Sequence, residues 1–389
     1  MAAPVLSAAR PSRAQASRPV RIGVLADQSG PYADSSGPGS VLAARLAATD
    51  VGGQVLGSPV EVLAGDSLNK PDVASVVARQ WFDAEGVDAI IDLPVTPVAA
   101  AVQQVAKEKG RTVMITGAAV TDFTNRLCSP LSTHWADDTH ALATGVARDM
   151  VAQGGRTWFF ITVDFTFGRA IEAEAGAIIR AQGGRVLGSA YFPIASTDFS
   201  AQLTQARASG AEVIGIAAVG NDQVNLIKQA SEFGVGMQSQ QKLAAFLVYI
   251  TDIHALGLAV TQDLVLASGF YWDQTEASRA FARRFYAARR AMPTKEQALC
   301  YVATRHFLAA MHQVGSRDPL AVNRAMRDLE VDYLGHPGHV RGDGRFLYDV
   351  TLYRVKQPAE SRAPWDYYAP LSTIPADQAF LPPAQNCGA

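Results

Sequence analysis

The sequence has few charged residues and no excess of either sign. Only 18% of its 389 residues are Asp, Glu, Lys or Arg, compared with about 25% in an average soluble domain. Thirty-four basic residues against 36 acidic ones give a formal charge of −2, so no basic field attracts nucleic acid or anionic lipid. No uninterrupted apolar run approaches the roughly 20 residues of a membrane-spanning helix. These absences argue against a nucleic-acid partner and against a membrane span.

The motifs of common enzyme classes are also missing. Gly37–Gly39 suggests a dinucleotide loop, but Leu42 occupies the place of the third glycine, and about ten residues separate the stretch from the preceding strand. No GxxxxGK[ST], HExxH or GxSxG sequence occurs. We interpret His336–His339 as an exposed turn, and His134 and His140 as a hydrogen-bond network near a hinge. The sequence therefore predicts neither an enzyme nor a bound cofactor or metal.

The three cysteines lack the spacing of a metal site. Cys128 lies in a loop before a proline, and Cys387 lies in the C-terminal tail. Because a terminal tail is ordered only when something holds it, we expect a disulfide between Cys128 and Cys387 in an oxidising compartment. Cys300 lies in an apolar helical run and is expected to be a small buried hydrophobic residue.

The first twenty residues are rich in Ala, Ser, Arg and Pro and contain no acidic residue. They include Ala14-Gln15-Ala16, the small-x-small pattern that signal peptidase recognises. This composition is typical of the end of an export signal. A disordered N-terminal tail explains it equally well, so both interpretations stay open.

The rest of the chain alternates short apolar strands with helices. One series runs from the strand at 21–26 to the strand at 112–116, and a second from 157–163 to 264–270. Apolar strands without polar alternation are typical of parallel sheets covered on both faces, so two α/β lobes are expected. Three later helices have no sheet of their own and must complete the earlier lobes, so the chain crosses between lobes more than once. These helices are expected at 276–291, 295–314 and 319–329.

Successive segments resemble the type I periplasmic solute-binding proteins of ABC transporters, the leucine/isoleucine/valine-binding family. The resemblance begins with RIGVLADQSGPYADSSGPGSVLAARLAATDVGG and continues through TVMITGAA, FGRAIEAEAG and DFSAQLTQARASGAEVIGIAAVGNDQVNLIKQASEFG. It covers nearly everything from Arg21 to about Tyr353. The late segment PAESRAPWDYYAPLSTIPADQAF is similar to the branch of the family that takes up small aromatic acids such as benzoate- and cinnamate-type compounds.

The resemblance implies an α/β fold of two Rossmann-like lobes, whose parallel sheets are flanked by helices and whose hinge has three crossings. Lobe 1 is then expected at 21–137 plus 271–345. Lobe 2 is expected at 138–270 plus 346–389, with a C-terminal tail that is free to pack back on lobe 1. The resemblance also implies a monomer exported to the periplasm, with a membrane permease of an ABC transporter as its partner.

The family's ligand pocket carries over to five positions of this sequence. The ligand-facing tyrosine of the first loop falls near Ser35, the carboxylate-binding serine at Thr96, the clamp at Ala118 and Val120, and the second-lobe aromatic at Phe167. A hydroxyl beside a helix N-terminus is suited to a carboxylate. Carboxylate recognition is therefore expected to be retained in part.

The sequence departs from amino-acid-binding members at the acid that pairs with the ligand's ammonium group. The resemblance places this acid in LAAFLVYITD, where the aligned residues are Ala245, Phe246 and Leu247. A buried unpaired ammonium costs several kcal/mol, so an amino-acid ligand is disfavoured. Phe246 and Tyr249, with Phe167, instead suggest a slot in which flat rings stack, although core packing explains Phe246 and Tyr249 equally well.

Four further residues are candidates for the cleft. Trp135 is interpreted as a cleft wall or a hinge wedge, and Asp137 stands where the family has a cleft-lining acid. Asn221 and Asp222 either line the cleft or cap the following helix.

The predicted function is that of an extracytoplasmic solute receptor of an ABC importer, which binds a small aromatic carboxylate between its lobes. A branched-chain amino acid or amide receptor is one alternative. A ligand-sensing regulatory protein of the same fold is another.

Overall fold

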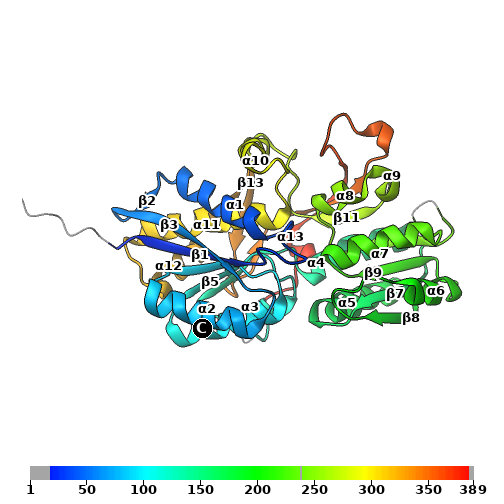
Figure 1. Ribbon diagram of the computed structural model, residues 1–389, viewed down its shortest axis with the longest axis horizontal. Helices are drawn as coiled ribbons and strands as arrows, with labels where there is room; N and C mark the ends of the chain where they lie inside the picture. Colours follow the sequence, from blue (N-terminus) through cyan, green and yellow to red (C-terminus); the bar gives the residue numbers. More distant parts are fainter. Residues whose placement is uncertain (1–17, 237–238, 385–389) are drawn as a thin grey trace, which may run out of the picture.

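The computed structural model describes residues 18–236 and 239–384. These residues form two α/β lobes, which Figure 1 shows as a blue, cyan and yellow lobe beside a green one. The predicted fold class is therefore confirmed. The predicted signal segment at 1–20 lies outside the described residues apart from its last three positions, and so does Cys387.

The first lobe contains a six-stranded sheet in the order β2-β3-β1-β4-β5-β6. All neighbouring strands are parallel except β2 and β3, which form a hairpin. Strands β4 and β5 are buried along their whole length, as expected for parallel strands covered on both faces. The strands are β1 (Val20–Ala26), β2 (Gln54–Val55), β3 (Ser58–Asp66), β4 (Ala89–Asp92), β5 (Thr112–Ile115) and β6 (Ser132–His134).

Six helices cover this sheet. Three follow its strands directly: α1 (Gly37–Asp50), α2 (Pro71–Gln80) and α3 (Thr96–Lys109). The other three come late in the chain: α10 (Glu276–Arg289), α11 (Lys295–Val314) and α12 (Pro319–Asp328). Helix α11 packs along α1 and is buried over most of its length (Figure 1). The expectation that the late helices complete an earlier lobe is confirmed, and so is the burial of Cys300, a free thiol in α11.

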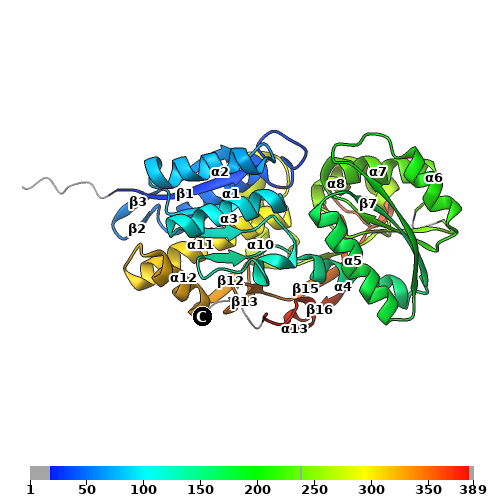
Figure 2. The same cartoon turned by 90° about the horizontal axis from the view of Figure 1, so that it is seen from below.

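The second lobe contains a parallel four-stranded sheet in the order β10-β9-β7-β8. Figure 2 shows its helices on both faces of the sheet. The strands are β7 (Thr157–Val163), β8 (Arg185–Phe192), β9 (Val213–Ala217) and β10 (Lys242–Ala245). The helices are α4 (Thr139–Ala152), α5 (Thr166–Ala181), α6 (Ser200–Ala208), α7 (Gly220–Glu232), α8 (Ile250–Leu256) and α9 (Leu258–Thr261).

Two small antiparallel sheets complete the fold. One consists of β11 (Val265–Ser268), β15 (Val350–Val355) and β16 (Tyr368–Ile374), with the short helix α13 (Ala376–Ala379) after it. The other consists of β12 (Glu330–Tyr333), β13 (His336–Val340) and β14 (Phe346–Leu347).

The interpretation of His336–His339 as a turn was wrong. These residues belong to strand β13, which pairs with β12. The turn lies just before them, where Leu334 and Gly335 have φ angles of 53° and 93°. Two consecutive residues with positive φ are typical of a tight hairpin turn, so the strand begins directly at His336.

Three chain segments cross between the lobes, and the carboxylate of Asp137 joins all three. Asp137 itself lies in the first crossing, between β6 and α4. Its Oδ1 accepts a hydrogen bond from the hydroxyl of Tyr348 in the third crossing (2.6 Å), and its carboxylate accepts one from the amide of Gly269 in the second (3.3 Å). The ammonium of Lys295 completes the cluster, 3.0 Å from Oδ2. Removing one partner of such a buried ion pair typically costs about 3–5 kcal/mol.

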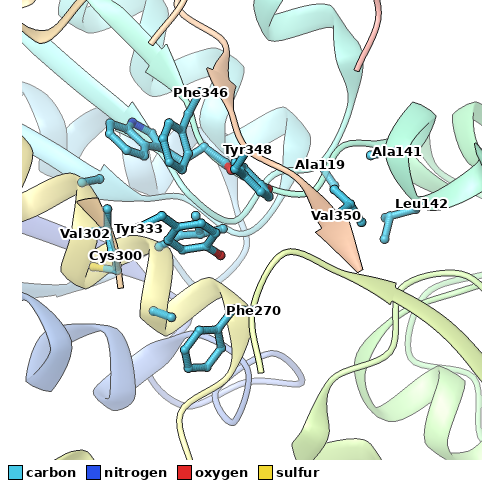
Figure 3. Packing of buried hydrophobic residues seen from close by; sticks show 14 of the residues in the cluster. Ala119, Ala141, Leu142, Phe270, Cys300, Val302, Tyr333, Phe346, Tyr348 and Val350 are labelled. Carbon is cyan, nitrogen blue, oxygen red and sulfur yellow. The ribbon is translucent and has the colours of Figure 1, made fainter. Parts of the chain in front are cut away.

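Aromatic rings pack beside this cluster. Figure 3 shows Tyr333, Phe346 and Tyr348 together at the third crossing, with ring centroids 4.9 to 5.5 Å apart. Both histidines of the expected hydrogen-bond network have polar partners, but not the same ones: His134 contacts Ala118 and Arg345, and His140 contacts Glu174. The exact lobe boundaries at 137/138, 270/271 and 345/346 stay a proposal.

Candidate functional site

A narrow cavity lies between the lobes, at the carboxyl ends of the parallel strands, where α/β folds usually bind ligands. Its walls leave about 20 Å³ for the centres of water molecules, which is room for about one water, so a larger ligand requires the walls to separate. The first lobe contributes Tyr32, Ser35, Pro94, Val95, Thr96, Gly117, Ala119 and Glu296. The second lobe contributes Phe165, Phe167, Val219, Leu247 and Tyr249.

The loop after β1 is folded by a buried carboxylate, which places Tyr32 in the cavity wall. Asp27, at the end of β1, accepts hydrogen bonds from the amides of Gly30 (2.7 Å) and Tyr32 (2.9 Å). The other end of the loop is held by α11, because the Thr294 hydroxyl donates to the carbonyl of Ser35 at 2.7 Å. Local hydrogen bonds at one end and a contact from a distant helix at the other therefore hold this wall in place without a ligand.

Helix N-termini from both lobes meet at the cavity. Thr96 is the first residue of α3, Phe165 is the N-cap of α5, and Val219 is the N-cap of α7. Helix N-termini carry partial positive charge and amide groups without helical partners. Their convergence from both lobes favours an anionic group in the ligand.

Aromatic rings from both lobes also line the cavity. Phe165 and Phe167 lie with ring centroids 6.2 Å apart in the second lobe. Tyr32 of the first lobe packs on the backbone of Gly220, where an added Cβ would lie 2.8 Å from the ring and φ is +66°. Gly220 therefore lets the lobes approach one another closely. The cavity is suited to a flat, apolar ligand body.

One carboxyl group, Glu296 of α11, also lines the cavity. Its Oε2 accepts a hydrogen bond from the Tyr249 hydroxyl of the second lobe at 3.0 Å. Burial raises the pKa of Glu296 well above its usual value, and the neighbouring Asp92 raises that pKa further. Burial also raises the pKa of the Tyr249 hydroxyl, with Glu296 contributing to the increase. As expected, the aligned residues of the LAAFLVYITD stretch bring no carboxyl group into the cavity wall. The fold nevertheless supplies one from α11, namely Glu296.

The structure places four of the predicted ligand residues in the cavity wall: Ser35, Thr96, Phe167 and Tyr249. All four residues follow the carboxyl end of a parallel strand, which is where the cavity lies. Tyr249 is buried, as the core-packing alternative predicts, but its hydroxyl also hydrogen bonds to Glu296 of the opposite lobe.

The other predicted residues do not line the cavity. Phe246 stacks in the core with Trp158 and Phe160, which is the core-packing alternative. Trp135 is fully buried against Phe346, and Asp137 holds the hinge.

The remaining four predicted residues have other contacts or positions. Both backbone groups of Ala118 bond within the first lobe, its amide to Leu93 and its carbonyl to His134. Val120 is buried beside it. In α7, Asn221 is exposed, while Asp222 accepts a hydrogen bond from the amide of Ala195.

Tyr32 and Phe165 lie in loops after strands that the sequence predicts at the cleft, but they were not singled out as ligand residues, and Glu296 was missed. The family's loop tyrosine was placed at Ser35, three positions from a tyrosine that was visible in the same loop. Phe165 precedes the expected aromatic Phe167 by two residues. No local signal marks Glu296, because its place in the cavity depends on how a late helix packs on the first lobe.

The described parts of the chain contain neither a membrane-spanning helix nor a cluster of metal ligands. No helix among residues 18–236 and 239–384 combines the length and apolarity that crossing a bilayer requires. The same residues contain no group of three or more His, Cys, Asp or Glu able to hold a metal ion.

Comparison with known proteins gives the family. The periplasmic binding protein family matches residues 19–361. A periplasmic binding protein from Burkholderia mallei is 41% identical, with 94% of this chain and 96% of that one covered and a TM-score of 0.90. A branched chain amino acid ABC transporter periplasmic ligand-binding protein from Burkholderia xenovorans is 38% identical, with 93% and 97% covered and a TM-score of 0.83.

Two more distant proteins also match, one by structure and one by sequence. An R. palustris solute-binding protein solved with benzoate is 18% identical, with 93% and 99% covered and a TM-score of 0.81. The Leu/Ile/Val-binding protein homolog 6 of Brucella melitensis is 25% identical over 241 residues, which cover 61% of this chain and 61% of that protein. With the fold, the cleft and a family match over most of its length, this chain belongs to the periplasmic binding protein family.

Proposed function

We propose that this protein is a periplasmic solute receptor of an ABC importer, which binds a small aromatic carboxylate between its lobes and delivers it to a membrane permease. Binding closes the lobes by hinge motion, and no bond is made or broken. The description of the B. xenovorans relative as part of an ABC transporter supports the transport role.

One observation carries the ligand class: the same cavity holds helix N-termini and aromatic rings from both lobes. The helix N-termini suit a carboxylate, and the rings of Tyr32, Phe165 and Phe167 suit the two faces of a flat ligand. A benzoate- or hydroxycinnamate-type acid combines both features.

A second candidate is a branched-chain amino acid or amide receptor. Glu296 is the observation that favours it, since a carboxyl group in the cavity wall can accept hydrogen bonds from an ammonium or amide group. The name of the B. xenovorans relative agrees with this candidate.

A thermal-shift panel of benzoate, 4-hydroxycinnamate, leucine and NAD separates these functions. A ligand at a hundred times its Kd stabilises the folded protein by about 2.7 kcal/mol. We expect the aromatic acids to raise Tm and NAD to leave it unchanged. Protection by leucine without protection by the aromatic acids would establish the second candidate, and protection by NAD would overturn the receptor class.

The variant Phe167→Ala tests whether the response comes from the cavity. It removes a ring from the second-lobe wall, so the rise in Tm with benzoate should shrink. The matched control is Phe233→Ala, which removes a ring at the C-terminal end of α7, away from the cavity. Equal shifts in both variants would mean that benzoate binds elsewhere.

A further inference from the structure

Glu296 is buried where the two lobes meet. It is the second residue of α11 and is only 2% exposed. Its Oε1 lies against the backbone of Gly117, where an added Cβ would come within 2.2 Å of that oxygen. Its Oε2 accepts the hydrogen bond from Tyr249 across the cleft. Glycine at position 117 therefore leaves the space that this carboxyl group fills.

A second carboxyl group lies behind it. Asp92, the last residue of β4, is fully buried, and its Oδ2 accepts a hydrogen bond from the Ser36 hydroxyl at 2.9 Å. Its Oδ1, like Oε1 of Glu296, is buried without a donor from the described residues. The two carboxyl groups are close enough to hydrogen bond to each other. A hydrogen bond between two carboxyl groups requires a proton on one of them.

The charged groups around the pair do not remove the need for this proton. Asp27, at the end of β1, adds a further negative charge and raises the pKa of Asp92, after the larger effect of burial. Lys295 is the adjacent cation, but its ammonium is bound by Asp137 and the carbonyl of Ala267. Burial raises the pKa of both Tyr249 and the Cys300 thiol, so these two groups stay neutral.

We propose that Glu296 determines ligand specificity as a neutral residue, because it and Asp92 share a proton at the floor of the cleft. This inference rests on the proposed function for the ligand's identity and goes beyond it in assigning the charge state of the site. A neutral Glu296 tolerates an anionic ligand under the helix N-termini. Loss of the proton places a buried negative charge beside that ligand and weakens its binding, so binding of benzoate favours the protonated pair.

The variant Glu296→Gln tests the charge state because glutamine is a neutral isostere of the protonated acid. Its carbonyl can accept from Tyr249 and its amide can donate to Asp92. At about pH 6 we expect its affinity for benzoate to change by less than about tenfold. Above the pH at which the pair ionises, wild-type affinity should fall by up to about tenfold per pH unit, whereas the variant should show a flatter profile. A loss of more than about tenfold in the variant at pH 6, or identical profiles to about pH 10, would overturn the proposal.

A measurement without ligand keeps this inference separate from the proposed function. Difference infrared spectroscopy between about pH 6 and pH 10 should show a protonated-carboxyl band in the wild type that is reduced in Glu296→Gln. Glu330→Gln, which changes an exposed carboxylate on β12, is the matched control and should retain the full band. If Glu296→Gln retains it too, the proton does not reside on the pair. Failure of benzoate to bind the wild type would overturn only the proposed ligand.

Discussion

At the scale of single residues, burial decides the chemistry of the acids in this protein. Asp252 of α8 is an example outside the cavity wall. Its Oδ2 accepts hydrogen bonds from the Tyr249 amide at 2.9 Å and from the Gln223 side chain at 3.5 Å. Burial raises its pKa from 3.8 to about 7, because these bonds offset only part of the desolvation of the charge.

Asp252→Asn should therefore change how stability depends on pH. The folded protein holds the Asp252 proton up to about pH 7, while the unfolded chain loses it near 3.8. The stability that this proton contributes is present below the unfolded value and is lost as pH rises to about 7. Relative to wild type, the variant should gain on the order of 4 kcal/mol over that range, measured by urea unfolding. Asp328→Asn, at an exposed position, is the control, and a parallel profile for both variants would contradict the prediction.

At the scale of elements, helix starts supply the polar part of the site. Proline at the beginning of α3 fits a first turn, where an amide has no helical partner to lose. That start fixes the hydroxyl of Thr96 at the end of a strand-to-helix loop, in the cavity wall. Helices α5 and α7 also begin after a strand-to-helix loop, and their N-termini lie at the cavity too.

Thr96→Val removes the hydroxyl while it keeps the shape of the side chain. If a ligand carboxylate lies at the start of α3, the affinity for benzoate should fall roughly tenfold to a hundredfold, as for a hydrogen bond to a charged group. Isothermal titration calorimetry measures this change. Thr204→Val, on an exposed face of α6, should bind as the wild type does. Unchanged affinity in Thr96→Val would place the carboxylate elsewhere in the cavity.

At the scale of the whole molecule, the C-terminal tail returns to the first lobe. Phe380 lies on the guanidinium of Arg345, 4.2 Å from its carbon, and the carbonyl of Leu381 accepts a hydrogen bond from Arg341. The tail then approaches the turn at Thr121–Thr124, since Pro382 and Ala384 line a surface cavity with Thr124. Cys128 follows Thr124 by four residues in the chain, while its predicted partner Cys387 lies outside the described residues.

The disulfide between Cys128 and Cys387 stays a prediction with a direct test. A non-reducing peptide map should contain a linked pair of peptides that reduction separates, and identical maps would refute the bridge. Replacing either cysteine by serine should lower stability by about 2–5 kcal/mol, because a disulfide restricts the unfolded chain. The double variant should lose no more than either single variant, since both remove the same bond.

The sequence by itself determined the lobes and most of their elements. Buried apolar strands such as β4 and β5 and the helices between them follow from local patterns of apolar residues, which depend on neighbours a few positions apart. Site residues in loops directly after strands, such as Thr96 and Phe167, could be predicted for the same reason.

Only the tertiary structure decided the role of residues whose contacts come from distant parts of the chain. Phe246 was a candidate for either the cleft or the core, and it packs in the core. Asp137 was expected to line the cleft, but it joins the three crossings. Glu296 was not expected there, and it reaches the cavity because α11, more than 200 residues after Asp92 in the chain, packs against the first lobe. Whether a carboxyl group is charged depends on its burial and its neighbours, and in this protein those neighbours come from distant parts of the chain.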